Sequence, residues 1–304
     1  MNIVVVITLA AFAVGTALSC GVCPTMKWAN CDGNPCKCYV MVGQGEKLFL
    51  NCTNLIPKCF LMKAEMYRAR KGESTRSGGK PHETAFVDND GIYDPDCEND
   101  GKFRAKQCNN TEECWCVNSA GVRRTDKGDT NLKCDKLVET YWIRLQLKHK
   151  PTTDKVDETK LINAIGNEIK SRYNFEKNLV KAIKYDPEAR LIEVDVKKEM
   201  GNRDTDLAQM AYYMEKDIKA LPLFKNQNKF EPSVESQKLE MENILVYYVD
   251  EEAPTFTMRN LPAGIIATIV VVVLAVVAGI LILIFMKKRQ MKYNKAQQRE
   301  MDPM

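Results

Sequence analysis

The chain has 304 residues, and its 44 lysines and arginines against 40 aspartates and glutamates give it a formal net charge of +4 at pH 7. Residues 287–304 contain six of the basic and two of the acidic residues, so the rest of the chain is neutral, with 38 of each sign. That balance argues against nucleic acid as the main partner, and the length allows two or three domains.

The first 19 residues have the pattern of a secretory signal peptide. Residues 3–14 are apolar, and Ala17-Leu-Ser19 places small residues where a signal peptidase reads them, just before Cys20. The stretch is too short for a second membrane span. We therefore expect cleavage after Ser19 and an extracellular N-terminus.

All twelve cysteines lie between Cys20 and Cys134. An even number of cysteines crowded behind a signal peptide indicates disulfides formed in an oxidising compartment. A zinc site is the alternative, but Cys36-Lys-Cys38 and Cys114-Trp-Cys116 lack the Cys-x-x-Cys spacing and the two histidines lie near neither pair. We therefore predict no metal site and no cofactor.

Residues 20–58 hold six of the cysteines, separated by turn-forming residues and with little apolar periodicity. Such a segment buries too little surface to fold unaided, so we predict a small disulfide-rich domain with three cross-links. Six cysteines allow fifteen pairings, and the residues do not choose among them. Two glycosylation sequons are present, one at Asn51 and one at Asn109.

The next predicted domain, residues 59–134, begins with a short helix near 60–67. The segment 68–80 that follows is basic, rich in glycine and serine and without large apolar residues, so we expect an exposed loop. Its Arg68-Ala-Arg70-Lys71 sequence predicts a protease-sensitive site for trypsin-like or furin-like enzymes. The alternative is a solvated loop that stays uncut.

The second half of this domain carries a specific series of motifs. They are, in order, Tyr93-Asp-Pro-Asp-Cys97, Gln107-Cys108, Cys114-Trp-Cys-Val117 and Gly121. The series resembles the thyroglobulin type-1 repeat. That resemblance implies consecutive pairing of the cysteines, as Cys59–Cys97, Cys108–Cys114 and Cys116–Cys134. Some members of that family inhibit cysteine proteases, whereas others act only as scaffold modules.

Residues 135–262 contain no cysteine and have the pattern of an α/β domain. Alternating apolar residues predict three strands, at 141–148, 191–196 and 244–249. Apolar residues at helical spacing predict three helices, at 157–173, 175–184 and 204–221. Asp204 or Thr205 is the expected N-cap of the last helix. The order of these elements favours a small sheet with helices on one face.

None of the common catalytic motifs is found in this sequence. It has no glycine-rich phosphate loop, no Gly-x-Ser-x-Gly turn and no His-Glu-x-x-His. The two histidines, His82 and His149, do not lie beside a plausible nucleophile. We therefore predict that the chain is not an enzyme.

Residues 263–286 are twenty-four consecutive residues without a charge. As a helix they would reach roughly 36 Å, enough to cross the ~30 Å hydrocarbon core of a bilayer, where a lone segment must be helical. Lys287, Lys288 and Arg289 follow at once, which places the tail 287–304 in the cytosol. These three residues either contact the anionic inner leaflet or serve only as a stop-transfer signal.

Four small residues of this span, Gly264, Thr268, Ala275 and Gly279, fall on one face of a helix. Small residues allow two helices to approach closely in lipid. We therefore predict that this face packs against a second copy of the chain or against a multi-span partner. Chance is the alternative, because alanine and glycine are common in spans.

The whole arrangement resembles the epithelial cell adhesion molecule (EpCAM) family. The most specific stretches are 59–66, Cys114-Trp-Cys-Val with 121–127, 247–250 and the span with its Lys-Lys-Arg. The resemblance implies the remaining pairs, Cys20–Cys36, Cys23–Cys52 and Cys31–Cys38. It also implies a glycoprotein of the epithelial plasma membrane and its junctions that binds itself and claudin-like proteins and undergoes regulated proteolysis.

The predicted fold class is a single-pass membrane protein with a disulfide-rich N-terminal domain, a thyroglobulin type-1 domain, an α/β domain and one transmembrane helix. The predicted function is adhesion and signalling by self-association, as a homodimer or larger assembly. Two other functional classes stay open. One is a membrane-tethered cysteine-protease inhibitor, and the other is a ligand-binding receptor, for which the short tail with its single Tyr293 offers little.

Overall fold

The computed structural model describes residues 20–73, 93–109, 112–152, 154–227, 229–235, 237–257 and 263–300. The chain forms two compact units, Met1–Pro254 and Thr255–Met304. The three segments predicted as separate extracellular domains therefore belong together in the first unit up to residue 254. The predicted signal peptide and residues 74–80 of the predicted loop lie outside the described ranges.

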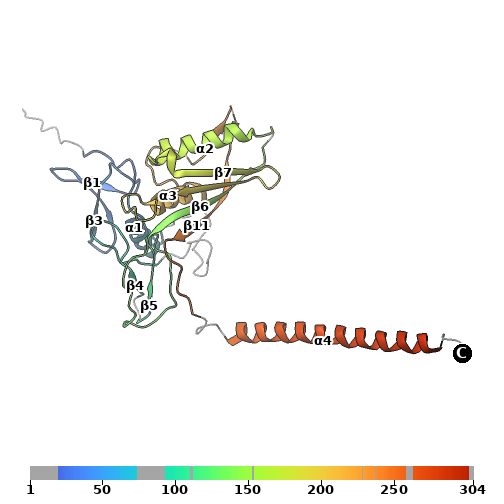
Figure 1. Ribbon diagram of the computed structural model, residues 1–304. Coiled ribbons are helices and arrows are strands. Elements are labelled where there is room, and N and C mark those ends of the chain that lie inside the picture. Colours follow the sequence, from blue (N-terminus) through green and yellow to red (C-terminus); the bar gives the residue numbers. More distant parts are fainter. Residues whose placement is uncertain are drawn as a thin grey trace, which may run out of the picture. The chain divides into compact units, whose positions relative to one another are not determined.

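The N-terminal segment is a three-stranded antiparallel sheet (Figure 1). Its strands are β1 (Asn30–Asp32), β2 (Lys37–Met41) and β3 (Lys47–Leu50), paired in that order. Three disulfides cross-link it, in the pairs that the resemblance implies: Cys20–Cys36, Cys23–Cys52 and Cys31–Cys38. Cross-links restrict the unfolded chain and so stabilise a segment that is too small for a large core of its own.

The thyroglobulin-like segment consists of helix α1 (Lys58–Arg70) and a ribbon of β4 (Lys106–Cys108) and β5 (Cys114–Cys116). Its disulfides also have the pairing that the resemblance implies: Cys59–Cys97, Cys108–Cys114 and Cys116–Cys134. Trp115 lies among them, only 6% exposed, with its ring centre 5.4 Å from that of Tyr93 in an edge-to-face pair. The aromatic pair and the cross-links together replace a larger core.

Helix α1 is longer than the sequence pattern predicts. The pattern places an exposed loop from residue 68 onward, but the helix continues through Arg70. The amide of Lys71 still donates to the carbonyl of Tyr67, and Gly72 then adopts a φ of +76°, which side chains disfavour. The prediction of a loop beginning at Arg68 is therefore wrong, because Gly72 ends the helix and the basic residues do not.

The remainder of the first unit is built on a four-stranded antiparallel sheet in the order β11-β6-β8-β7. Its strands are β6 (Thr140–His149), β7 (Val180–Asp186), β8 (Leu191–Lys197) and β11 (Met241–Asp250). The other elements are α2 (Glu158–Tyr173), the 3₁₀ turn η1 (Lys177–Leu179), α3 (Leu207–Lys219), β9 (Ser233–Val234) and β10 (Gln237–Lys238). The three predicted strands and the helix predicted at 157–173 are confirmed.

Both helices pack on one face of this sheet, where the core lies. Ile143, Leu145 and Leu147 alternate along β6 and are fully buried. The apolar stripes of the two helices pack in the same core: Leu161, Ile165 and Ile169 from α2, and Met210, Ala211 and Met214 from α3. Burial of each large aliphatic side chain contributes roughly 1.5–3 kcal/mol. This face therefore stabilises the fold and leaves the opposite face for other contacts.

The helix predicted at 175–184 is wrong. Asn174 adopts a left-handed φ of 55° and ends α2, and the chain then makes the η1 turn and enters β7. β7 pairs with β8, so Ile183 lies opposite Val194 in the sheet. The tertiary pairing outweighs the helical spacing of this short segment.

The N-cap predicted for α3 is also wrong. The cap is Asp206, whose carboxylate accepts hydrogen bonds from the backbone amides of Ala208 (2.9 Å) and Gln209 (3.2 Å). The amides of Asp204 and Thr205 instead donate to the side chain of Asn202, in the turn before the helix. The helix therefore begins at Leu207 rather than at residue 204.

The second unit contains one long helix, α4 (Ala263–Glu300). Its segment Ala267–Arg289 is long and apolar enough to cross a membrane, with a mean hydropathy of 3.5. The helix continues past the predicted end of the span into the basic tail, where Lys287, Lys288 and Arg289 are exposed. Three residues of the predicted packing face are exposed along it: Thr268, Ala275 and Gly279. The surroundings of Gly264 lie outside the described residues.

Candidate functional site

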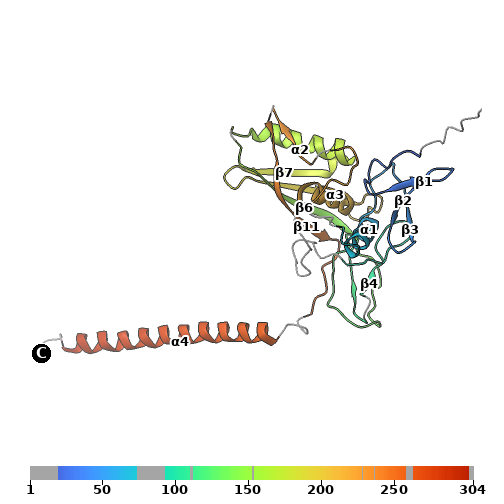
Figure 2. The same cartoon turned by 180° about the vertical axis from the view of Figure 1, so that it is seen from behind.

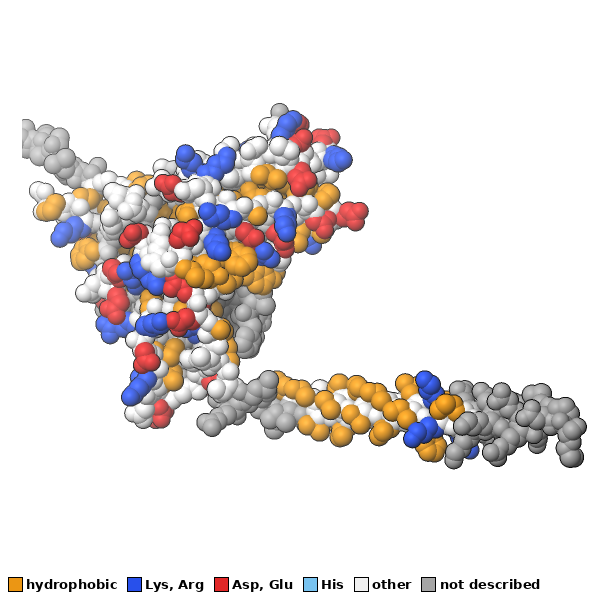
Figure 3. Space-filling view, in the orientation of Figure 1, with side chains coloured by type: hydrophobic (Ala, Val, Ile, Leu, Met, Phe, Trp, Pro, Cys, Tyr) orange, Lys and Arg blue, Asp and Glu red, His pale blue; other side chains and the backbone are white. Residues whose placement is uncertain are grey.

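One face of the four-stranded sheet has no helix packed on it in the described part of the unit. On β6 the side chains of Trp142, Arg144 and Gln146 alternate with the buried ones and are only partly buried. We call this surface the outer face, formed by Trp142, Arg144, Gln146, Glu193, Asp195, Lys197, Leu245, Tyr247 and Val249. Figure 3 shows hydrophobic side chains gathered over β6 and β11, bordered by basic and acidic ones.

The centre of the outer face is an ordered group of three side chains. Arg144 of β6 lies opposite Asp195 of β8 and donates to it twice, from Nε at 2.7 Å and from a terminal nitrogen at 2.9 Å. Trp142 donates its indole N–H to the same carboxylate at 3.2 Å. The hydrogen bond from Arg144 lowers the pKa of Asp195, which stays ionised at neutral pH. The bidentate ion pair holds these side chains in one arrangement.

The rest of the outer face extends this pattern. Gln146 donates to Glu193 across the strands at 2.8 Å, and the hydroxyl of Tyr247 donates to Gln146 at 3.3 Å. Lys197 lies 5.9 Å from the ring centre of Trp142, and Tyr247 is 37% exposed. The surface thus combines an exposed and a partly buried aromatic ring with charges of both signs. Such a surface is suited to binding another protein.

A network of buried polar contacts connects the sheet to the thyroglobulin-like segment. Arg124 donates from Nε to Asp250 at 3.0 Å and from a terminal nitrogen to the carbonyl of Glu252 at 2.5 Å. Asp250 also accepts from Asn118 and from Thr140, each at 2.8 Å. Hydrogen bonds to a buried carboxylate are among the strong ones. The end of β11 is therefore fixed to the repeat.

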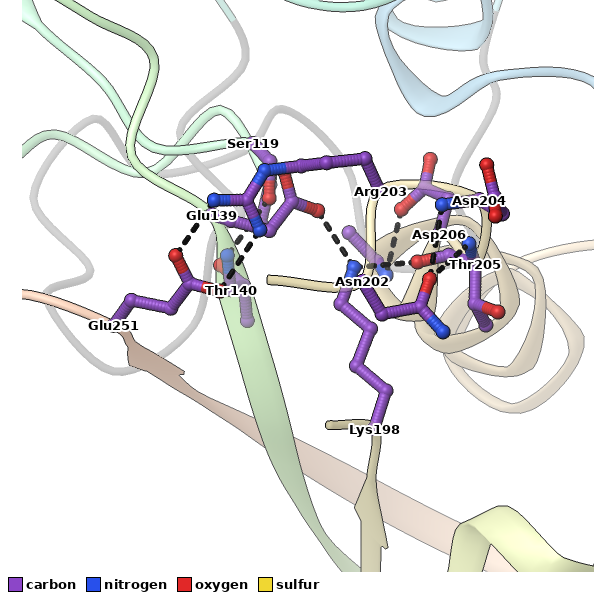
Figure 4. Close-up of polar contacts among 12 residues, drawn as sticks. Ser119, Glu139, Thr140, Lys198, Asn202, Arg203, Asp204, Thr205, Asp206 and Glu251 are labelled. Atoms are coloured by element: carbon purple, nitrogen blue, oxygen red, sulfur yellow. Dashed lines mark hydrogen bonds and ion pairs between the residues drawn. The ribbon is translucent and has the colours of Figure 1, made fainter. Parts of the chain in front are cut away.

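Figure 4 shows a second polar cluster, between the end of β8 and the start of α3. The fully buried ammonium group of Lys198 donates to Glu139 at 2.7 Å and to the carbonyl of Thr205 at 2.5 Å. Arg203 donates twice to Glu251, each time at 2.8 Å. These hydrogen bonds from Arg203, with the amide of Gly201, lower the pKa of Glu251 to about 2. Both contacts hold the loop before α3 against the sheet.

A third group joins α1 to α3, which lie side by side in Figure 2. Glu65 of α1 is 1% exposed and accepts hydrogen bonds from Tyr212 at 2.5 Å and from Lys216 at 2.6 Å. Lys58, at the start of α1, is buried between the rings of Tyr212 and Tyr248. The three groups explain why the segments before residue 255 form a single unit.

The burial of Lys58 predicts a pH dependence of stability. Burial lowers the pKa of Lys58 from 10.5 to about 8, although Glu215 and Asp206 oppose the shift. The folded state therefore binds fewer protons than the unfolded chain between these two values, so the free energy of unfolding rises with pH across that window and is lowest below it. The expected increase in the free energy of unfolding is about 3 kcal/mol.

Denaturant unfolding of the full chain in detergent, measured from below pH 8 to above pH 10.5, tests this expectation. The Lys58→Met variant lacks the titrating group and is expected to lose the rise with pH. An equal rise of the free energy of unfolding with pH in parent and variant would show that other groups cause it.

The described residues provide little for catalysis or for a metal. His149 is buried, and its ring nitrogens lie 2.7 Å from the carbonyl of Lys150 and 3.0 Å from the hydroxyl of Tyr185. That environment is typical of a core histidine with both nitrogens satisfied. Within the described ranges no group of three or more His, Cys, Asp or Glu side chains is placed to hold a metal ion. His82 lies outside those ranges.

The chain was compared with known protein families and curated proteins. Residues 140–250 match the family model for the C-terminal region of EPCAM/Trop-2, and residues 64–134 match that for the thyroglobulin type-1 repeat. The chain is 42% identical to the epithelial cell adhesion molecule of Mus musculus over 290 residues, 92% of this chain and 89% of that one. The chain belongs to the EpCAM/Trop-2 family. It is also 39% identical to tumor-associated calcium signal transducer 2 of Homo sapiens over 287 residues, 92% and 86% of the two chains.

Membership of the EpCAM/Trop-2 family confirms the resemblance and the fold class inferred from the motifs. A further relative, the epithelial cell adhesion molecule of Homo sapiens, is 43% identical over 255 residues, 81% of this chain and 77% of that one. The matched regions include β6, β8 and β11, which carry the outer face.

The glycosylation and protease sites predicted for this EpCAM/Trop-2 family member lie in segments of the chain other than the strands of the outer face. Asn51 is exposed in its sequon, and its side-chain oxygen accepts from the hydroxyl of Thr53 at 2.7 Å. Asn109 donates to Glu113 at 3.1 Å, while Thr111 of the second sequon lies outside the described residues. Occupancy of both sequons stays a prediction.

The predicted protease-sensitive residues are more ordered than the sequence suggested. Arg68 and Arg70 lie in the last turn of α1, with Lys71 at its C-cap. Arg70 forms an ion pair with Asp94 at 2.6 Å. A protease that cuts at these residues would first have to unwind this turn, because a protease cleft requires extended backbone.

The outer face was not among the sites predicted from the sequence. The strand at 141–148 was predicted from its buried side, and the residues between received no role. Their types carried a usable signal: a tryptophan, an arginine and a glutamine on the exposed side of a strand, with acidic residues at alternate positions of 191–196. Only the pairing of β6 with β8 shows that these charges meet.

Proposed function

We propose that this EpCAM/Trop-2 family member is a cell-surface adhesion and signalling glycoprotein that works by self-association through its outer face. The names of its relatives, an adhesion molecule and a signal transducer, favour this function over inhibition of cysteine proteases. The observation that carries the proposal is the ordered group of Trp142, Arg144 and Asp195 at the centre of the outer face.

The outer face is suited to a second copy of the chain because it carries both charges. A two-fold interface sets a patch against the same patch of the partner, so the surface has to be complementary to itself. Arg144 and Lys197 alternate with Glu193 and Asp195 across β6 and β8. Apolar and aromatic side chains of β11 lie beside them, and contact with a partner would bury their apolar surface.

Replacement of Trp142 by alanine is expected to weaken self-association roughly thirty-fold, because a central interface tryptophan contributes about 2 kcal/mol. Self-association is measured by fluorescence energy transfer between donor-labelled and acceptor-labelled full chains in vesicles. The measurement is repeated as the protein is diluted with lipid. The matched control is Phe49→Ala, which removes an aromatic side chain that is 56% exposed on β3. Unchanged association in the Trp142 variant, or equal loss in both, would contradict the proposal.

The span adds a second proposed contact in the plane of the membrane. The small-residue face of α4, with Ala275 and Gly279 at helical spacing, allows close packing of another helix. Its proposed occupants are a second copy or a claudin-like protein at lateral membranes and junctions of epithelial cells. The basic cluster after the span adds ~1 kcal/mol for each basic residue near an anionic inner leaflet.

Cleavage by a trypsin-like or furin-like protease is proposed for the segment between Arg68 and Lys80, in addition to the regulated proteolysis at the surface and in the membrane that the family resemblance implies. The disulfide Cys59–Cys97 joins the residues on its two sides. A cut within the segment would therefore leave two pieces that separate only on reduction. Cleavage there would destabilise the end of α1, the helix whose Glu65 contacts Lys216 of α3. Cleavage would therefore lower the stability of the whole unit.

A further inference from the structure

The N-terminal sheet has an exposed aromatic side chain close to the first predicted glycosylation site. Phe49 of β3 is 56% exposed, although phenylalanine is usually buried. Asn51 follows this strand, two residues further on, and is exposed too. From residue 47 to residue 52 the odd-numbered side chains are exposed and the even-numbered ones are partly buried. Phe49 and Asn51 therefore lie on the same side of the chain, roughly 7 Å apart along the strand.

The ring of Phe49 is held in place by its neighbours. Phe49 lies opposite Tyr39 of β2, with 6.1 Å between the ring centres in an edge-to-face pair. Tyr39 is itself only 9% exposed, and its hydroxyl donates to Asp32 at 3.0 Å. The Nζ of Lys37 lies 5.8 Å from the ring centre of Phe49. The exposed part of Phe49 is therefore an ordered apolar surface.

Asn51 is also held in one conformation. Its Oδ1 accepts from the hydroxyl of Thr53 at 2.7 Å and from the backbone amide of Thr53 at 3.1 Å. Its Nδ2, the atom that carries an N-linked sugar, makes no hydrogen bond within the described part of the chain. The next residue, Cys52, is bonded to Cys23, which is 1% exposed. A sugar on Asn51 would therefore be attached to a fixed base beside the ring.

We propose that Asn51 carries an N-linked glycan whose first N-acetylglucosamine packs on the ring of Phe49. The C–H groups of a sugar ring form an apolar surface, and contact with an aromatic ring removes both surfaces from water. Because the sugar is tethered two residues from the ring, its effective concentration at the ring is high. The inference rests on the glycoprotein character that forms part of the proposed function, and it is independent of self-association through the outer face.

The covalent step is the transfer of an oligosaccharide from a lipid diphosphate carrier during export. A bond forms between Nδ2 of Asn51 and C1 of the first N-acetylglucosamine, and the C1–O bond to the diphosphate breaks. Nδ2 loses one proton, and the lipid diphosphate leaves. The sequon Asn51-Cys-Thr53 supplies the acceptor.

A double-mutant cycle on the full chain in detergent tests the contact. The thermal midpoint is measured for the parent, Phe49→Ala, Thr53→Ala and the double variant, all made in cells that produce high-mannose glycans. Thr53→Ala removes the sequon but keeps Asn51 and its hydrogen bond from the amide of residue 53. Phe49→Ala is expected to lower the midpoint by roughly 2–4 °C more with the glycan than without it, as one moderate contact does in a unit of this size.

Leu221→Ala is the matched control, because it removes an apolar side chain that is 47% exposed elsewhere in the unit. Its effect is expected to be the same with and without the glycan. Endoglycosidase H trims a high-mannose glycan to its first sugar, and the trimmed protein is expected to keep the coupling to Phe49. Mass spectrometry of the peptide that contains Asn51 measures occupancy.

Three results would overturn the proposal. An additive cycle in protein with an occupied Asn51, or a coupling equal to that of Leu221, would exclude the contact while the chain remains a glycoprotein. Loss of the coupling on trimming would exclude the first sugar as the contacting group. An unmodified Asn51 would exclude both the contact and glycosylation at this sequon, and self-association through the outer face would still be tested by its own experiment.

Discussion

Replacement of Glu65 by alanine is expected to lower the free energy of unfolding of the first unit by about 3–5 kcal/mol. The side chain is 1% exposed, and its carboxylate accepts from Tyr212 and Lys216 across the contact of α1 with α3. Without it, the ammonium of Lys216, itself 3% exposed, loses its carboxylate partner in a place that water hardly reaches. Denaturant unfolding of the full chain in detergent, followed by tryptophan fluorescence, measures the loss.

A double variant separates the cost of breaking the pair from the contribution of the intact pair. Glu65→Leu combined with Lys216→Met removes both charges, and most of the loss is expected to be recovered. Tyr212 still loses its hydrogen bond to Glu65, which leaves about 1 kcal/mol. Unfolding of the single variant at the same denaturant concentration as the parent, or a double variant less stable than the single one, would contradict this expectation.

Replacement of Gly121 by alanine is expected to destabilise the thyroglobulin-like segment strongly. Gly121 has a φ of +75°, which costs an alanine roughly 1–2 kcal/mol. A Cβ at this position would also lie 2.5 Å from the ring of Phe103, which is 2% exposed and cannot move outward freely. Overpacking of this kind adds about 1–3 kcal/mol.

Gly45→Ala is the matched control, because Gly45 has a similar φ of +80° and no atom lies within 4 Å of an added Cβ. The control therefore carries the backbone cost without the clash. The amount of full chain at the cell surface and its thermal midpoint are expected to fall much further for Gly121→Ala. Equal effects of the two substitutions would show that the contact with Phe103 is unimportant.

The elements that could be predicted are those with a strong local signal. The apolar alternation of 141–148 and 191–196 and the helical stripe of 157–173 each place their residues on one buried face whatever surrounds them. The segment 175–184 was predicted wrongly because it is short and its spacing fits both a helix and a strand. Pairing with β8 decides between the two, and that pairing is not visible in the segment itself.

The same division applies to the candidate site. The spacing of apolar residues showed which side of β6 is buried, but it could not show that Arg144 and Asp195, which are 51 positions apart, form one ion pair. The contact of α1 with β2 of the N-terminal sheet likewise depends on how distant parts of the chain pack together.

The sequence by itself determined the one long apolar span found in the described residues and the division into a cysteine-rich and a cysteine-free part. These follow from local properties, namely hydrophobic length and residue type, which act before the chain folds. Only the tertiary structure decided that the segments before residue 255 form one unit and that, among the described residues, no helix covers one face of the sheet. Those features arise from contacts such as Glu65 with Lys216 and Arg124 with Asp250, between residues more than 100 positions apart.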